Sequence, residues 1–111
     1  LHLDPARTGY TAASLRDADV GLLALRDEIA LIKGILNFFN VVEGSARSFE
    51  PHRITFYLLD LVARFHSYYN KTRVIGDDRR VTLARLLLLD MLRQVIRSGL
   101  GILGVSAPEK M

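Results

Sequence analysis

The stretch from Val81 to Ile96, VTLARLLLLDMLRQVI, decides the fold class of this chain. Its apolar side chains recur at steps of three and four residues, which is the period of an α-helix. They cover most of the helix and leave a narrow polar stripe, made of Thr82, Arg85, Arg93 and Arg97. A helix that is apolar on most sides must be buried by its neighbours. We expect this helix, capped by Asp77 or Asp78 and ending before Gly99, to lie in the middle of a helical domain.

Further amphipathic segments precede this helix. The first is expected from about Ser14 to Phe39, with a buried stripe of Leu22, Leu25, Ile29, Ile32, Leu36 and Phe39. Gly34 inside it costs about 1 kcal/mol relative to Ala, which suggests that a neighbour approaches closely. Asn40 is then expected to cap a short helix that continues to Ala46.

Another helix is expected to start at Pro51, because proline suits the first turn of a helix, and to end near Gly76. Its buried stripe is Ile54, Leu58, Leu61, Phe65 and Tyr68. No segment alternates apolar and polar residues for long enough to form a strand. The sequence therefore predicts an all-α antiparallel helical bundle over residues 15–111. Residues 1–14 are interpreted as a leading segment or the remnant of a linker.

Length and composition exclude several classes of protein. The 111 residues allow one ordinary domain, and half of them are hydrophobic, as in a folded globular chain. The absence of cysteine excludes disulfides and thiolate metal sites and fits a cytoplasmic protein. A membrane span needs roughly 18 apolar residues, whereas the longest uncharged stretch, Ser98 to Pro108, has eleven. Because the chain opens at Leu1 rather than Met, we expect it to be a piece of a longer protein.

The sequence offers no catalytic or metal site of its own. Gly99-Leu100-Gly101-Ile102-Leu103-Gly104 matches the pattern G-x-G-x-x-G, but a dinucleotide loop needs a strand before it and a helix after it. Gly99 and Gly104 are interpreted as turn positions instead. The histidines at 2, 52 and 66 lack the spacing of metal ligands, and the serines lie in no nucleophile motif.

Basic charge and aromatic rings gather in the second half of the chain. Residues 1–50 carry five basic and seven acidic side chains, whereas residues 51–111 carry ten and five. The region between the last two predicted helices holds Phe65, His66, Tyr68, Tyr69, Lys71, Arg73, Arg79, Arg80 and Arg85. Single-stranded RNA loops are bound by such a mixture, because bases stack on rings and cations hold phosphates. The same residues are equally compatible with core rings beside a solvated charged face.

The order of several short motifs resembles one family, the C-terminal, DALR-type anticodon-binding domain of arginyl-tRNA synthetase, a class Ia enzyme. The strongest motifs are Leu83-Ala84-Arg85-Leu86, Arg93-Gln94-Val95-Ile96, Leu103-Gly104-Val105 and the terminal Ala107-Pro108-Glu109-Lys110-Met111. Glu50-Pro51-His52-Arg53 and Tyr68-Tyr69-Asn70 are similar to the preceding helix of that domain. The resemblance covers residues 20 to 111.

The resemblance implies a function in protein synthesis. The parent enzyme, a ligase, would join arginine to its tRNA with ATP and magnesium on a separate catalytic domain of the same chain. The fragment would hold no cofactor and no catalytic residue, and would bind neither DNA nor membranes. It would recognise the anticodon loop, whose central base is cytosine in every arginine tRNA.

The resemblance also suggests the site. It carries RNA contacts to Tyr69, Arg73 and Met111, although Arg73 departs from the aromatic residue found in some relatives. We add Tyr68, Arg79, Arg80 and Lys110 from the local sequence, and expect the Lys110-Met111 tail to close the pocket. Two alternatives stay open: a helical protein-docking module, or the equivalent domain of the glycyl-tRNA synthetase β chain.

Overall fold

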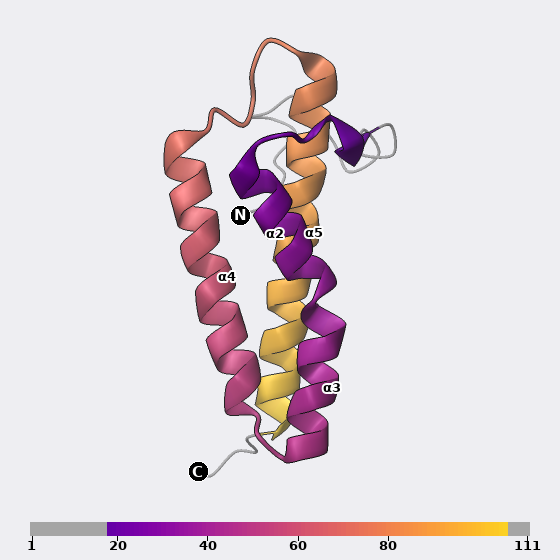
Figure 1. The fold of residues 1–111 in the computed structure, drawn as a ribbon, viewed down its shortest axis with the longest axis vertical. Coiled ribbons are helices and arrows are strands. Elements are labelled where there is room, and N and C mark those ends of the chain that lie inside the picture. Colours follow the sequence, from indigo (N-terminus) through magenta and orange to yellow (C-terminus); the bar gives the residue numbers. More distant parts are fainter. Residues whose placement is uncertain (1–17, 107–111) are drawn as a thin grey trace.

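The computed structural model describes residues 18–106, which form four α-helices and one short 3-10 helix and contain no strand (Figure 1). The elements are η2 (Val20–Leu22), α2 (Arg26–Leu36), α3 (Phe38–Ser48), α4 (His52–Lys71) and α5 (Arg79–Ser106). The all-α prediction is confirmed. The leading segment expected at residues 1–14 lies outside the described residues.

Helix α5 forms the long axis of the molecule. Its 28 residues span about 42 Å at 1.5 Å per residue. Helix α4 runs antiparallel beside it, and α2 and α3 follow each other along the other side (Figure 1). The loop between α4 and α5 therefore lies at one end of the bundle, and the turn between α3 and α4 lies at the other.

The core forms where α2, α4 and α5 meet. The largest fully buried aliphatic side chains of this core are Leu31, Leu61, Leu88 and Leu92. Burying each of them contributes roughly 1.5 to 3 kcal/mol. Gly34 lets α2 approach α4, because a Cβ there would lie 3.1 Å from Leu61 Cδ1. The close approach expected at this glycine is thus confirmed.

The helix ends follow recognisable capping chemistry. Asp78 caps α5, since its Oδ1 accepts the backbone N–H of Arg80 at 3.0 Å. Helix α3 ends at Ser48. The next residue, Phe49, has a left-handed φ of 56°, and the Glu50 N–H donates to the Ser45 carbonyl at 2.9 Å. This is a Schellman motif with phenylalanine where glycine is usual.

The predicted end of the last helix was wrong. Helix α5 does not stop at Gly99 but continues through Gly101 and Gly104 to Ser106. Gly99 is buried because α4 packs on it, and a Cβ there would lie 2.9 Å from Leu58 Cδ2. Gly99 therefore serves helix packing, and neither it nor Gly104 is a turn position.

The first predicted helix differs in its extent and in its buried face. Residues 18–25 hold only the short η2, and α2 begins at Arg26 rather than near Ser14. Asn40 lies inside α3 and does not cap it. Four members of the predicted buried stripe, Leu25, Ile29, Leu36 and Phe39, are between 42% and 77% exposed. The core side of α2 carries Glu28 and Leu31 instead, and Thr82 on the expected polar stripe of α5 is also buried.

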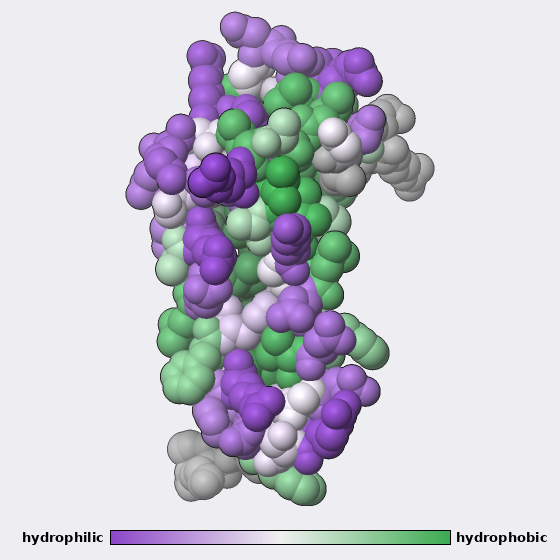
Figure 2. All heavy atoms as spheres, viewed as in Figure 1, coloured by the Kyte–Doolittle hydropathy of each residue, from purple (hydrophilic) through white to green (hydrophobic). Residues whose placement is uncertain are grey.

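These four exposed apolar residues, which belong to α2 and α3 or directly precede α2, are called the α2–α3 stripe (Leu25, Ile29, Leu36 and Phe39). Figure 2 shows apolar surface gathered in the upper half of the molecule, where α2 and α5 overlap in this view.

Within residues 18–106, no single helix has the length and composition of a membrane span. Helices α2 and α3 meet those criteria only as a pair, and a bend of 41° separates them.

Candidate nucleic-acid interface

The aromatic and basic residues singled out in the sequence meet at the end of the bundle that carries the α4–α5 loop, residues 72–78. Tyr69, in the last turn of α4, is 55% exposed. Its ring lies 5.4 Å from that of Phe65, measured between centroids, at an interplanar angle of 33°. The Tyr69 ring therefore packs at a tilt against Phe65, while much of the side chain remains open to a ligand.

Tyr68 does not belong to this surface, so its assignment to the RNA-binding set was wrong. Its side chain has no exposed area, and its hydroxyl donates a hydrogen bond to Glu28 Oε2 at 2.6 Å. Burial, and secondarily the Glu28 carboxylate, raise the pKa of the Tyr68 hydroxyl. Adjacent residues point about 100° apart on a helix, which is why Tyr68 enters the core and Tyr69 does not.

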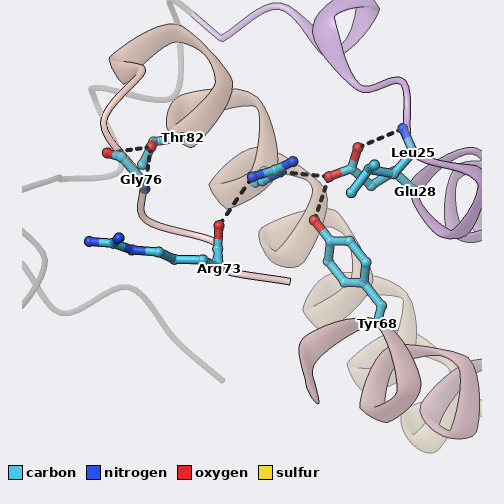
Figure 3. A network of polar contacts seen from close by, with 7 residues as sticks. Leu25, Glu28, Tyr68, Arg73, Gly76 and Thr82 are labelled. Atoms are coloured by element: carbon cyan, nitrogen blue, oxygen red, sulfur yellow. Dashed lines mark hydrogen bonds and ion pairs between the residues drawn. The ribbon is translucent and has the colours of Figure 1, made fainter. Parts of the chain in front are cut away.

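A buried polar network lies directly beneath the loop (Figure 3). Its centre is the Glu28 carboxylate, which is 1% exposed. Besides the hydrogen bond from the Tyr68 hydroxyl, this carboxylate accepts two more. The Leu25 backbone N–H donates to Oε1 at 3.1 Å, and Arg85 Nε donates to Oε2 at 2.7 Å. The negative charge is therefore matched by a cation and by two further donors, as a buried carboxylate requires.

The network continues into the loop itself. Arg85 Nη1 donates to the Arg73 carbonyl at 3.1 Å, and the Gly76 N–H donates to Thr82 Oγ1 at 3.0 Å (Figure 3). Arg73 Nε also donates to the Ile75 carbonyl at 3.1 Å. The loop is thus attached to α5 at two points, which limits the conformations open to Arg73.

Cationic side chains surround this corner. Arg73, Arg79 and Arg80 are all exposed, and they come from the loop and from the first turn of α5. Lys71 is exposed as well, with its Nζ 2.9 Å from Asp27 Oδ2. Asp77 and Asp78 offset part of the charge, but Asp78 is engaged in capping α5. The arrangement places an exposed ring and three guanidinium groups at the same end of the bundle, which suits a nucleic-acid loop.

Two residues that organise the corner, Glu28 and Thr82, were not predicted from the sequence as part of the site. Glu28 stands three, four and seven residues before Leu31, Ile32 and Ile35, so it shares a face with apolar residues. Thr82 and Arg85 lie on an otherwise apolar helix that had to be buried, so both needed polar partners. The pattern held a signal for a buried pair, but it did not identify which carboxylate would meet Arg85.

Two predicted site residues, Lys110 and Met111, lie outside the described residues. The described part of α5 ends at Ser106, at the end of the bundle opposite the α4–α5 loop (Figure 1). That position does not favour the expected closure of a pocket around Tyr69 by the tail, which stays a prediction. Among residues 18–106 no three potential ligands are grouped to hold a metal ion.

Comparisons with known proteins point to one family. The family model described as the DALR anticodon binding domain matches residues 10–111. The chain is 56% identical over 103 residues to the arginine–tRNA ligase of Geobacter metallireducens, covering 93% of this chain and 18% of that protein. It is 50% identical to those of Syntrophotalea carbinolica and Azoarcus sp., again over 93% of this chain and over 19% and 18% of theirs. The chain therefore spans less than a fifth of the length of these relatives, and no solved structure matches it.

Proposed function

This chain belongs to the DALR anticodon binding domain family, and on that premise we propose that it recognises the anticodon loop of arginine tRNA. The observation that carries the proposal is the position of Tyr69, which is exposed at the same end of the bundle as Arg73, Arg79 and Arg80. An anticodon base that leaves its stack can lie on the Tyr69 ring while the guanidinium groups neutralise the phosphates beside it.

The two kinds of contact have different roles. Base stacking on an aromatic ring contributes about 1 to 3 kcal/mol, whereas phosphate contacts raise affinity for any RNA and weaken as salt rises. Arg73 is suited to either role, because a guanidinium plane stacks on bases and also grips phosphates. Preference for the central cytosine would then require hydrogen bonds to the edge of that base.

We further propose that these 111 residues work within a longer cytoplasmic arginine–tRNA ligase, in which a catalytic domain elsewhere in the same polypeptide uses ATP and magnesium. The names and lengths of the relatives support this proposal. The α2–α3 stripe is available for a contact with that domain, because its four apolar side chains are between 42% and 77% exposed. The alternatives, a docking module alone or the glycyl β-chain domain, are not favoured by these relatives, which are arginine–tRNA ligases.

The test is to titrate the chain with the anticodon stem-loop of an arginine tRNA at low salt and to measure the dissociation constant. Tyr69→Ala should weaken binding by roughly fivefold to 150-fold, the equivalent of about 1 to 3 kcal/mol. Arg80→Gln should weaken binding and also flatten its salt dependence. A stem-loop with uracil at the central anticodon position should bind less tightly than the cytosine form.

Phe56→Ala is the matched control, because Phe56 is an equally open ring on α4, 64% exposed and far from the loop. It should leave the dissociation constant unchanged. Equal effects of the two substitutions, or equal binding of the cytosine and uracil stem-loops, would contradict the proposed recognition.

A further inference from the structure

We propose that Arg85 and Glu28 are positioning residues for RNA binding, because together they hold the α4–α5 loop in its binding conformation from inside the bundle. The inference rests on the proposed function, since it concerns how that same surface is built. Neither side chain is assigned a contact with RNA. Their effect passes through the backbone of Arg73.

Arg85 joins three parts of the chain. Its Nε lies 2.7 Å from Glu28 Oε2 on α2, and its Nη1 lies 3.1 Å from the carbonyl oxygen of Arg73 in the loop (Figure 3). The Arg85 side chain is 19% exposed and that of Glu28 is 1% exposed, so the ion pair is largely shielded from solvent, whereas the hydrogen bond to the Arg73 carbonyl lies at the surface. A change in α2 is thereby connected to the backbone that carries Arg73.

The connection from Glu28 to the Arg73 carbonyl needs an arginine at position 85. A guanidinium group is planar and presents several donors in a rigid fork, so one side chain can bind a carboxylate and a carbonyl at once. A lysine ammonium keeps the charge but is a compact point charge on a flexible stem. Arg85→Lys should therefore retain the ion pair with Glu28 and lose the tie to Arg73.

A second hydrogen bond joins the loop to the same helix, α5. Thr82 lies one turn before Arg85, and its hydroxyl accepts the Gly76 N–H at 3.0 Å. The loop is therefore held at Arg73 and at Gly76, on either side of Ile75. A loop that is already ordered pays less conformational entropy when it binds, which raises affinity without any new contact.

The experiment compares Arg85→Lys with wild type in two measurements, stem-loop binding and hydrogen exchange of the amides from Arg73 to Asp78. We expect the dissociation constant to rise roughly three- to tenfold and these amides to exchange faster. Arg93→Lys is the matched control, because Arg93 is on the same helix and bonds Asp90, one turn away. It should change neither quantity.

A second variant covers the case in which Arg85→Lys does not fold. Glu28→Gln combined with Arg85→Met removes both charges, so no unpaired charge is left buried. The amide oxygen introduced at position 28 can still accept the hydrogen bond from the Tyr68 hydroxyl. This double variant should fold, with a loosened loop and weaker RNA binding.

The outcomes separate the two proposals. If wild type does not bind the stem-loop, the proposed function fails, and loop exchange alone still tests the tie through Arg85. If wild type binds and a folded variant matches it in both affinity and loop exchange, the positioning role is overturned. If Arg85→Lys lowers affinity, and Tyr69→Ala lowers it by the same factor in the Arg85→Lys background as in wild type, the two effects are independent. Arg85 then acts through the loop and not through the Tyr69 ring, as proposed.

Discussion

At the scale of single residues, burial of one side chain decides what its neighbours can do. Glu28 is drawn into the core by the Tyr68 hydroxyl and Arg85, and this orients α2 so that Leu31 packs inward and Ile29 remains exposed. Hydrophobic periodicity could not predict this orientation, because it treats a carboxylate as a surface residue. The bond to Glu28 also separates Tyr68, which is buried, from Tyr69, which is exposed, although both were predicted to bind RNA.

The backbone conformation of Phe49 is one that glycine adopts more easily. Phe49 is the one described non-glycine residue with positive φ, at 56°, and its side chain is 90% exposed. Phe49→Gly should raise the free energy of unfolding by about 1 kcal/mol, because glycine adopts this conformation without a steric cost. Urea denaturation followed by circular dichroism measures the change.

Phe39 serves as the control for that substitution. It is also an exposed phenylalanine of α3, at 77%, but it lies within the helix. Phe39→Gly should lower stability by a few tenths of a kcal/mol, because glycine is a poorer helix former than phenylalanine. Destabilisation by both substitutions would show that the left-handed geometry at Phe49 carries no cost.

At the scale of elements, glycines that were predicted to end a helix lie inside it in the structure. The series from Gly99 to Gly104 was expected to end the last helix, because glycine favours helix ends. Helix α5 instead runs through it, and Leu58 of α4 packs on the buried Gly99. The existence and order of the helices could be predicted from periodicity, but these boundaries depend on packing between helices, which a local pattern does not contain.

Substitution of these glycines tests the packing. Gly99→Ala should destabilise the bundle by up to about 2 kcal/mol, because overpacking against Leu58 Cδ2, 2.9 Å from the new methyl group, costs about 1 to 3 kcal/mol and alanine's better helix propensity recovers about 1 kcal/mol. Gly101→Ala should stabilise it by about 1 kcal/mol, because among the described residues the helix's neighbours leave the space within 4 Å of the added Cβ open, and alanine favours the helix. Thermal unfolding of the two variants measures both effects, and equal shifts of Tm would refute the close contact.

At the scale of the whole molecule, the all-α bundle and the basic end of α4 could be predicted from the sequence, whereas the surface of α2 could not. Periodicity shows that Leu25, Ile29, Leu36 and Phe39 share a face, but it does not say whether this chain or another domain covers that face. Similarly, the sequence brought Tyr69 and Arg73 together, while the ties that hold the loop came from residues distant in sequence, Glu28 and Arg85.

The most direct test of the RNA-binding surface is to map it on the chain itself. Backbone amide chemical shifts would be recorded while the arginine tRNA anticodon stem-loop is added to wild-type protein. We predict that the shifts concentrate between Tyr69 and Arg80, with small changes around the α3–α4 turn at the opposite end. Shifts concentrated around Phe49 and Arg53, with Tyr69 and Arg73 unchanged, would contradict the placement of the anticodon loop at the α4–α5 end.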